Sequence, residues 1–340
     1  MANNTPKAIE DFNSLLEVYD YFTDEQKCLD YLATQRWDGE VICPHCEHDK
    51  VYVFSDKKRF KCAKCRQQFT AKVGTIFEDS KIAMRKWYVA IYLVTSHKKG
   101  ISSHQLAKDL KVTQKTAWFM LHRIRFGLGA NEDMTELEGN IQLDETFVGG
   151  KNKNRHKDKK VEQSQGRSFK DKTPVMGMLQ EKIVANVERP HKVIEGKTVN
   201  EKVVIQKSVV RCRVVPDTKT ESIQPIIRSN VKENSIVVSD EWFAYNGLGN
   251  AYDHRVIDHR AKEYVNANGD TTNALEGFWT GLKRSYIGIY HHVSRKHLQY
   301  YVNEVTFRYN TREMSEGARL SHTLTMTKGR LKYKQLTANA

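Results

Sequence analysis

Residues 140–148 have the sequence NIQLDETFV, and residues 236–240 have the sequence IVVSD. Both are short apolar runs rich in β-branched residues, which are typical of strands in the core of a sheet. The first run contains Asp144, and the second ends at Asp240. A third acid, Glu276, follows Asp240 after 35 residues, where a helical pattern begins. These three carboxylates are the candidates for a catalytic site built on regular secondary structure.

Three carboxylates on rigid elements suit the in-line cleavage of a phosphodiester bond. That reaction must stabilise both the entering and the leaving oxygen, which two Mg²⁺ or Mn²⁺ ions about 4 Å apart can do. Carboxylate oxygens are the hard ligands that these ions prefer. Lys283 follows Glu276 by about two helical turns, so both side chains share one helix face. Lys283 and the adjacent Arg284 could therefore hold a DNA phosphate near the ions.

Each acid also has a purely structural interpretation. The second aspartate could cap the helical turn that follows it, and the first could be a polar residue on a half-exposed strand. Asn273 and Glu276 have the spacing of a capping box, in which the glutamate turns back to its own helix end. Glu145 and Glu241 stand beside two of the candidates, so acidity alone does not identify the three.

The segments around these acids predict an α/β domain over residues 138–312. Strand-like runs recur up to Asp240, and helical patterns begin near Asn273 and Ser294. Strands with helices between and after them favour a sheet covered by helices. Residues 151–172 interrupt this pattern with nine Lys or Arg, three acids and two large apolar residues, so they predict a basic loop. The loop is either a solvated insertion or a contact to phosphates.

Four of the six cysteines gather in the N-terminal part of the chain. Cys43 and Cys46 form one CxxC pair, and Cys62 and Cys65 form a second pair 15 residues later. Two such pairs have the spacing of a four-thiolate zinc ribbon, whose tight turns point the sulfurs at one Zn²⁺. Buried structural cysteines are the alternative, and a redox dithiol would need one pair rather than two. The sequence therefore predicts a zinc ribbon.

Residues 100–125 (GISSHQLAKDLKVTQKTAWFMLHRIR) have the length of two helices and a turn. Ser102 or Ser103 can cap the first helix, and Thr113 can cap the second. With the apolar residues facing inward, the outward side chains would be Gln114, Lys115, Thr116, His122, Arg123 and Arg125. This surface could lie in a DNA major groove, with Gln114, Lys115 and Arg123 as contacts. An amphipathic helical hairpin with a basic exterior is the alternative.

The charge of the chain favours an anionic partner. The 340 residues include 55 Lys and Arg against 41 Asp and Glu, which gives a formal charge of +14. Such an excess favours nucleic acid, although it also serves solubility. No apolar run reaches about 18 residues, and the N-terminus lacks a basic start followed by an apolar stretch. We therefore expect no membrane contact and no secretory signal, and a cytoplasmic protein.

Several longer blocks carry a family resemblance. They are RW at 36–37 before the first cysteine pair, DETFVGGK at 144–151, VSDEW at 238–242, NALEGFWTGLKR at 273–284, GIYHHVSRKHL at 288–298 and FRYNTR at 307–312. Together they resemble the zinc-ribbon DDE transposases of bacterial insertion sequences, of the ISXO type, over nearly all of residues 20–312. Several blocks in one order are more specific than any single motif.

The resemblance implies an RNase H-like catalytic core in which Asp144 and Asp240 are the first two metal ligands. The third position varies in the family between Glu, Asn and His, and this chain offers both Glu276 and Asn273. The 35-residue interval and the offset of Lys283 match the common DDE pattern, which favours Glu276. Asn273 is retained as an alternative or accessory ligand.

The resemblance also implies the reaction and the partner. Cleavage at the terminal inverted repeats of an insertion sequence would free 3′-hydroxyl groups, which then attack target DNA at the same metal pair. Double-stranded DNA is the partner, and such transposases generally work as homo-oligomers that bring two ends together, here at a bacterial nucleoid. His254 and His259 lie in a family-like stretch, and a structural role is the simpler interpretation for both.

The expected organisation is a multidomain α/β chain. Its parts are an N-terminal helical segment (1–36), a zinc ribbon (37–75), a helix-turn-helix domain (80–130), an RNase H-like DDE catalytic domain (138–312) and a C-terminal tail (313–340). Two other functions remain open. A domesticated, non-catalytic DNA-binding regulator would tolerate the loss of an acid, and an RNase H-like nuclease would need fewer DNA-reading modules.

Overall fold

The structure is a computed structural model that describes residues 8–149, 156–162, 172–190, 198–258, 265–266 and 268–338. Contacts divide the chain into two compact units. The first contains Met1–Asp133, Gly288–Tyr290 and Asn303–Ala340, and the second contains Met134–Ile287 and His291–Val302. Over the described ranges, no helix combines the length and the apolar character that a membrane span requires.

The first unit is built mainly from helices. They are η1 (Ile9–Asp11), α1 (Leu15–Tyr21), α2 (Glu25–Trp37), α3 (Met84–Ser96), α4 (Ser103–Leu110), α5 (Gln114–Ala130), α8 (Leu298–Asn310, from Asn303 onward), α9 (Glu316–Thr325) and α10 (Tyr333–Thr337). Ten of the thirteen residues of α3 are buried. Trp87, Tyr88 and Ile91 are among them, and they share one apolar core with residues of α1, α2, α5 and α9. The unit is therefore organised around α3.

Two capped helices, α4 and α5, pack against each other across a three-residue turn. The hydroxyl of Ser102 accepts a hydrogen bond from the backbone N–H of Gln105, and the hydroxyl of Thr113 accepts one from Thr116. Each cap satisfies a backbone donor that has no partner within its helix. Both caps predicted from the sequence are confirmed.

The C-terminal residues belong to the first unit and are not the tail that we expected over 313–340. Helix α9 packs against η1, α2 and α3, and Leu320 and Leu324 are fully buried. The Arg319 guanidinium donates to the carbonyl oxygens of Thr95 at 2.9 Å and Thr311 at 3.1 Å. The sequence did not reveal this role, because the partners of α9 lie more than 200 residues earlier in the chain.

The first unit also contains a small antiparallel sheet in the order β1-β2-β3. Its strands are β1 (Val51–Val53), β2 (Arg59–Cys62) and β3 (Gln68–Thr70). All three are only three or four residues long, and the sheet carries the cysteine-rich segment described below.

The second unit contains a five-stranded sheet in the order β10-β9-β4-β5-β8. The strands and helices of the unit are β4 (Asn140–Gly149), η3 (Lys157–Lys159), β5 (Lys172–Gln180), β6 (Ile183–Pro190), β7 (Thr198–Gln206), β8 (Val209–Val214), α6 (Thr220–Arg228), β9 (Ile236–Asp240), η4 (Phe243–Tyr245), η5 (Leu248–Asn250), β10 (Asp253–Ile257), α7 (Asn273–Ser285) and η7 (Arg295–His297). The π-helical turn η6 (Tyr286–Tyr290) begins in this unit, and its residues Gly288–Tyr290 belong to the first unit. Strands β4, β9 and β10 are parallel, and β5 is antiparallel to both of its neighbours. The unit thus has the mixed α/β architecture predicted from the sequence.

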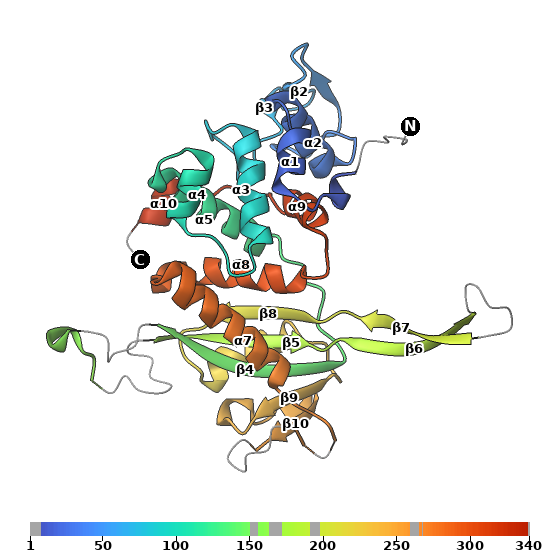
Figure 1. Cartoon of the computed structure of the whole chain (residues 1–340), viewed down its shortest axis with the longest axis vertical. Coiled ribbons are helices and arrows are strands. Elements are labelled where there is room, and N and C mark those ends of the chain that lie inside the picture. The colour runs from blue at the N-terminus through green and yellow to red at the C-terminus, as the bar shows by residue number, and fades with distance from the viewer. Residues whose placement is uncertain are drawn as a thin grey trace. The chain divides into compact units, whose positions relative to one another are not determined.

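One two-stranded segment of this unit is separate from the five-stranded sheet. Strands β6 and β7 pair with each other as a separate ribbon (Figure 1). The expected basic loop over 151–172 falls mostly outside the described residues, which include 156–162 and 172 of it.

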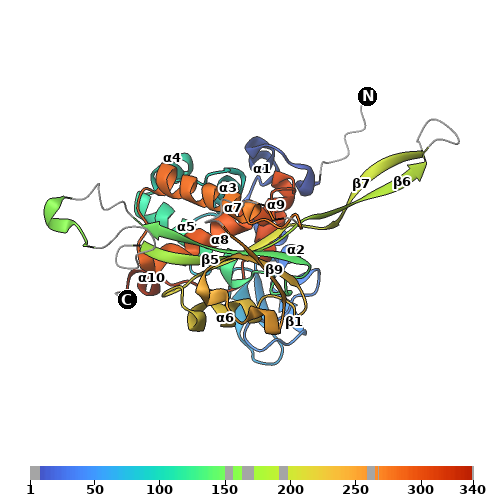
Figure 2. The same cartoon turned by 90° about the horizontal axis from the view of Figure 1, so that it is seen from below.

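Helices cover both faces of the five-stranded sheet (Figure 2). Ile223 and Ile227 of α6 pack with Ile141 and Leu143 of β4 in one apolar cluster. Side chains alternate along a strand, so the even-numbered residues of β4 point to the opposite face. Helix α7 contacts β4 and β5 on that opposite face. Asp144 is therefore on the face that α7 covers.

A buried charge cluster joins α5 to α8 within the first unit. Glu304 is 1% exposed, and its carboxylate accepts hydrogen bonds from the guanidinium groups of Arg125 (2.5 Å) and Arg308 and from the Tyr290 hydroxyl (2.5 Å). Burial opposes the charge on Glu304, but the two arginines outweigh it and lower its pKa to about 2. Because the pKa falls on folding, the ionised glutamate stabilises the fold above about pH 4.5, and this contribution is lost as the pH drops toward 2.

Glu304→Gln should destabilise the first unit by about 3–5 kcal/mol at neutral pH, because it leaves two buried guanidinium groups without a carboxylate. Urea unfolding of the full chain measures the loss, which should shrink as the pH falls below about 4.5. The control Glu138→Gln breaks an exposed ion pair with Lys232 and should have little effect. Equal losses in the two variants would contradict the role given to Glu304.

Candidate active site and metal centre

The four cysteines of residues 43–65 converge on one point. The Sγ atoms of Cys43 and Cys65 are 3.7 Å apart, those of Cys46 and Cys62 are 3.5 Å apart, and all four lie within 4.8 Å of one another. The Sγ atoms of Cys43 and Cys62 each accept a backbone N–H bond within their own CxxC turn. A Zn–S bond of about 2.3 Å puts the sulfurs of a tetrahedral site about 3.8 Å apart. The geometry fits the zinc site predicted from the sequence.

Only a few apolar side chains support these cysteines. The rings of Phe60 and Phe69 stack with centroids 5.5 Å apart, and Trp37 packs edge-on against both. A cluster of this size cannot stabilise three very short strands unaided. A Zn²⁺ ion bound by these cysteines would therefore supply much of the folding free energy of the ribbon.

In the second unit, β4 and β9 place Asp144 beside Asp240. The two strands are parallel, and Gln142 lies opposite Val238. Continuing this register by two residues brings Asp144 opposite Asp240. Neighbouring strands are about 4.8 Å apart. Asp144 and Asp240 each follow a residue of the pair Gln142–Val238 by two positions, so each side chain points to the same face as that residue. The two carboxylates therefore emerge side by side on one face of the sheet.

Helix α7 is attached to β4 at two points. The backbone N–H of Leu275 donates to Gln142 Oε1, and the indole N–H of Trp279 donates to Asp144 Oδ2, both at 2.9 Å. Leu275 and Trp279 are four residues apart, a rise of about 6 Å along the helix. Their acceptors Gln142 and Asp144 are two residues apart, about 7 Å along the strand. Because the two spacings match, the first turns of α7 lie along β4. This brings Glu276, which follows Leu275, toward Asp144.

A glycine makes room for this attachment. Gly177 lies opposite Asp144 on β5, and a Cβ atom there would stand only 2.5 Å from the Trp279 ring. The sequence interpretation missed three residues that position the site, Gln142, Gly177 and Trp279. The i, i+4 spacing of Leu275 and Trp279 is the one signal in the sequence for these positions, because it places both side chains on the same face of the helix.

Burial and like charges raise the pKa of Asp144 to about 6. Desolvation is the largest cause, Asp240 is the next, and Glu276 adds a smaller contribution. The N–H groups of Glu145 and Trp279 act in the opposite direction. Asp240 and Glu276 thus lie close enough to Asp144 to disfavour its ionised form, and a cation beside Asp144 would have the opposite effect.

The carboxylates are less tightly gathered than the cysteines. Within the described ranges, the four cysteines are the one group of three or more ligand-type side chains whose donor atoms all lie within 4.8 Å. The carboxylate oxygens of Asp144, Asp240 and Glu276 therefore do not all lie within 4.8 Å of one another, as the four sulfurs do.

The start of α7 bears on the choice of the third ligand. The residue before the helix is Thr272, and no side chain caps the helix start, so the capping box of Asn273 and Glu276 is not formed. Both side chains are exposed. Glu276 is therefore not turned back to its own helix end.

The acids on the two strands have distinct partners. One oxygen of Asp240 accepts the backbone N–H of Trp242 at 3.0 Å, so Asp240 does cap the turn that follows it. A carboxylate has about four acceptor positions, so this one bond does not by itself prevent Asp240 from binding an ion. Glu145 points to the opposite face, where it accepts the Tyr245 hydroxyl at 2.5 Å. This separates Glu145 from its neighbour Asp144.

Four of the five candidate DNA contacts are exposed. They are Gln114 and Lys115 in the first turn of α5 and Lys283 and Arg284 near the end of α7. Lys283 is two helical turns from Glu276, so it shares the face of α7 that carries the candidate ligand.

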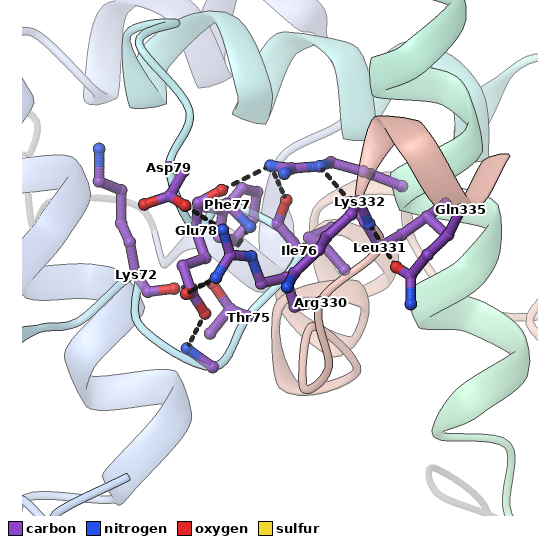
Figure 3. A network of polar contacts seen from close by, with 12 residues as sticks. Lys72, Thr75, Ile76, Phe77, Glu78, Asp79, Arg330, Leu331, Lys332 and Gln335 are labelled. Carbon is purple, nitrogen blue, oxygen red and sulfur yellow. Dashed lines mark hydrogen bonds and ion pairs between the residues drawn. The ribbon is translucent and has the colours of Figure 1, made fainter. Parts of the chain in front are cut away.

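The prediction that Arg123 faces outward is wrong. Arg123 is 5% exposed, and its guanidinium donates to the carbonyl oxygens of Ile76, Glu78 and Leu331 (Figure 3). His122 and Arg125, also predicted to face outward, are buried as well. The reason is that α8 and residues near 331, which the sequence did not place, pack against this part of α5.

His254 has a structural environment. Its ring bonds to the Ser239 hydroxyl at 2.9 Å, and burial lowers its pKa. Ser239 and Asp240 are consecutive in a strand, so their side chains point to opposite faces. His259 lies outside the described residues.

Cys43→Ser should reduce the zinc content of the purified chain from about one ion to near zero, because the ribbon loses one of four ligands. Elemental analysis after dialysis measures this. Cys212→Ser is the matched control, since Cys212 is buried in the other unit and should leave the zinc content unchanged. Full zinc occupancy in Cys43→Ser would refute the assignment.

Two family models match the chain. The ISXO2-like transposase domain matches residues 136–310, and the transposase zinc-ribbon domain matches residues 23–68. The first match contains the three candidate carboxylates, and the second contains the four clustered cysteines.

Two relatives extend these matches. An uncharacterized protein in transposable element ISH50 of Halobacterium salinarum is 28% identical over 300 residues, which is 84% of this chain and 91% of that protein. An uncharacterized transposase-like protein of Haemophilus influenzae is 29% identical over 102 residues, which is 30% of this chain and 80% of that protein. Since the ISXO2-like match alone spans more than half of the chain, the protein belongs to the ISXO2-like transposase family of the IS1595 group and carries the zinc ribbon of transposases.

Proposed function

We propose that this protein is a DDE transposase that binds the terminal inverted repeats of an insertion sequence and transfers their ends to target DNA. Hydrolysis breaks a phosphodiester bond and leaves a 3′-hydroxyl group. That hydroxyl then forms a bond to a target phosphorus atom while a target P–O bond breaks. The family supports the class of reaction. The observation that carries the catalytic assignment is geometric: Asp144 and Asp240 lie on neighbouring parallel strands, and Glu276 lies on the helix whose Trp279 donates a hydrogen bond to Asp144.

The donor set fits two divalent ions of the Mg²⁺ or Mn²⁺ type. Carboxylate oxygens are the hard ligands that such ions prefer, and two ions would supply stabilisation of the entering and leaving oxygens. Asp144 on β4, Asp240 on β9 and Glu276 on α7 would hold these ions, with Asn273 as the alternative or accessory ligand.

When bound, the ions stabilise charge on the attacking and departing oxygens. The residues of the chain position the reactants. Trp279 and the backbone N–H of Glu145 each hold one oxygen of Asp144, which fixes the orientation of that carboxylate. Lys283 and Arg284 are exposed on α7 and would hold phosphates of the DNA strand in line with the site.

The DNA-binding parts are proposed on the same basis. A mixed sheet with one antiparallel inner strand and helices on both faces supports an RNase H-like core. Two capped helices across a three-residue turn support a helix-turn-helix, with Gln114 and Lys115 of α5 in the major groove of double-stranded DNA. Synapsis of two ends requires two such modules, so we propose a homo-oligomer at the bacterial nucleoid, in the cytoplasm.

Asp240→Asn should abolish Mg²⁺-dependent cleavage of a duplex that carries the terminal repeats, because it removes a charged ligand of the reacting centre. DNA binding in a mobility-shift experiment should be unchanged. The control Glu241→Gln alters the neighbouring acid and should retain cleavage. Cleavage by Asp240→Asn at the rate of the unmodified chain would exclude the catalytic assignment. Binding without cleavage by the unmodified chain would favour a regulator.

Trp279→Phe should slow cleavage by roughly 10–100-fold, because residues that hold a metal ligand in place typically have effects of this size. The variant keeps an aromatic ring over Gly177 but loses the N–H that bonds Asp144. Its Mg²⁺ requirement should shift to higher concentration, which a purely structural loss would not produce. Trp87→Phe removes an indole bond to Ser80 in the other unit and serves as the control.

A further inference from the structure

Helix α5 is exposed in its first turn and buried in its middle. Gln114 and Lys115 are exposed, whereas every residue from Met120 to Arg125 is buried. A groove-reading helix uses its N-terminal residues for base contacts, and neighbouring segments bind the flanking phosphates and fix its register. The single exposed turn of α5 offers few phosphate contacts of its own. Further phosphate contacts would therefore have to come from the segments that lie beside this turn.

The segment beside this turn is α10, from the C-terminal end of the chain. The ring of Tyr333 lies 5.3 Å from the ring of Phe119 and 6.5 Å from that of Trp118. The Lys115 Nζ atom lies 5.1 Å from the centre of the same tyrosine ring. Residues separated by more than 200 positions in the sequence thus form one continuous surface at the start of α5.

This C-terminal segment is strongly basic. Residues 328–334 (KGRLKYK) contain four basic residues and no acid. Arg330 pairs with Glu78 at 2.6 Å and with Asp79, so its charge is compensated within the fold (Figure 3). Lys332 and Lys334 are exposed on either side of Tyr333. Together with the exposed Lys111 and Lys115, they define what we call the α5–α10 surface.

The lysines are presented from a fixed backbone. Arg123 donates to the carbonyl oxygen of Leu331 at 3.1 Å, and the backbone N–H of Lys332 donates to the Gln335 side chain at 2.8 Å (Figure 3). Leu331 is 4% exposed, so the residue before Lys332 is anchored in the core. Arg123 therefore acts as a positioning residue for the segment that carries Lys332, through its bond to the Leu331 carbonyl.

We propose that Lys332 and Lys334 bind DNA phosphates beside the groove that α5 enters, so that the C-terminal segment completes the DNA-binding surface of the helix-turn-helix. This inference rests on the proposed DNA-binding role of α5. It assigns a function to residues that follow the catalytic core in the sequence and that the sequence pattern marked only as a tail.

The test compares double variants of the full chain on a fluorescent duplex that carries the terminal repeats, by anisotropy at several KCl concentrations. Lys332→Ala/Lys334→Ala should weaken binding, and the slope of log affinity against log salt should become shallower by about 2, because two phosphate contacts are lost. Lys98→Ala/Lys99→Ala is the matched control. Both of these lysines are exposed beyond the far end of α3, and they should leave the slope unchanged.

A third variant, Lys115→Ala, separates the inference from the function on which it rests. If Lys115→Ala weakens binding while Lys332→Ala/Lys334→Ala behaves like the control, the C-terminal contacts are refuted and the role of α5 stands. If the unmodified chain binds and none of the variants differs from the control, both are refuted. Absence of binding by the unmodified chain refutes the proposed function itself. Circular dichroism melts confirm that each variant is folded before it is compared.

Discussion

The proposed active site depends on how α7 lies along β4. Two hydrogen bonds from the helix, by Leu275 and Trp279, go to side chains of the strand. One of these acceptors is the candidate ligand Asp144 itself, so the strand that carries the first ligand also sets the position of Glu276. Burial, with further contributions from Asp240 and Glu276, raises the pKa of Asp144, so the ionised form of this carboxylate is disfavoured at its position. Divalent ions would offset this effect.

The arginines of the first unit show why net charge alone overstates a DNA-binding surface. Arg123, Arg125, Arg308 and Arg319 are each less than 10% exposed. Their guanidinium groups bond to backbone carbonyls and to Glu304, because five N–H donors in a planar fork can join several elements at once. Part of the formal charge of +14 therefore holds the unit together. The lysines, which stay at the surface, are the better guide to phosphate contacts.

The features that the sequence predicted depend on neighbours in the chain. The CxxC turns, the caps at Ser102 and Thr113, and the zinc ribbon of the matched family all follow from residues a few positions apart. The mixed sheet followed from apolar runs. Arg123 was misplaced because its partner Leu331 is 208 positions away. The roles of Gly177 and Trp279 could not be predicted for the same reason, because the two residues contact each other across about 100 positions of the sequence, from a strand to a helix.

The membership of α9 in the first unit has a consequence for the order of events during synthesis. Helix α3 leaves the ribosome more than 200 residues before α9, which covers part of it. The strands of the second unit are made in between, so they can pair while the first unit still exposes apolar surface. The first unit, to which we assign the proposed DNA-binding role, can therefore be completed only after α9 has been made. A nascent chain that has not yet reached α9 would lack the finished first unit, so the proposed DNA binding would require α9 to be present.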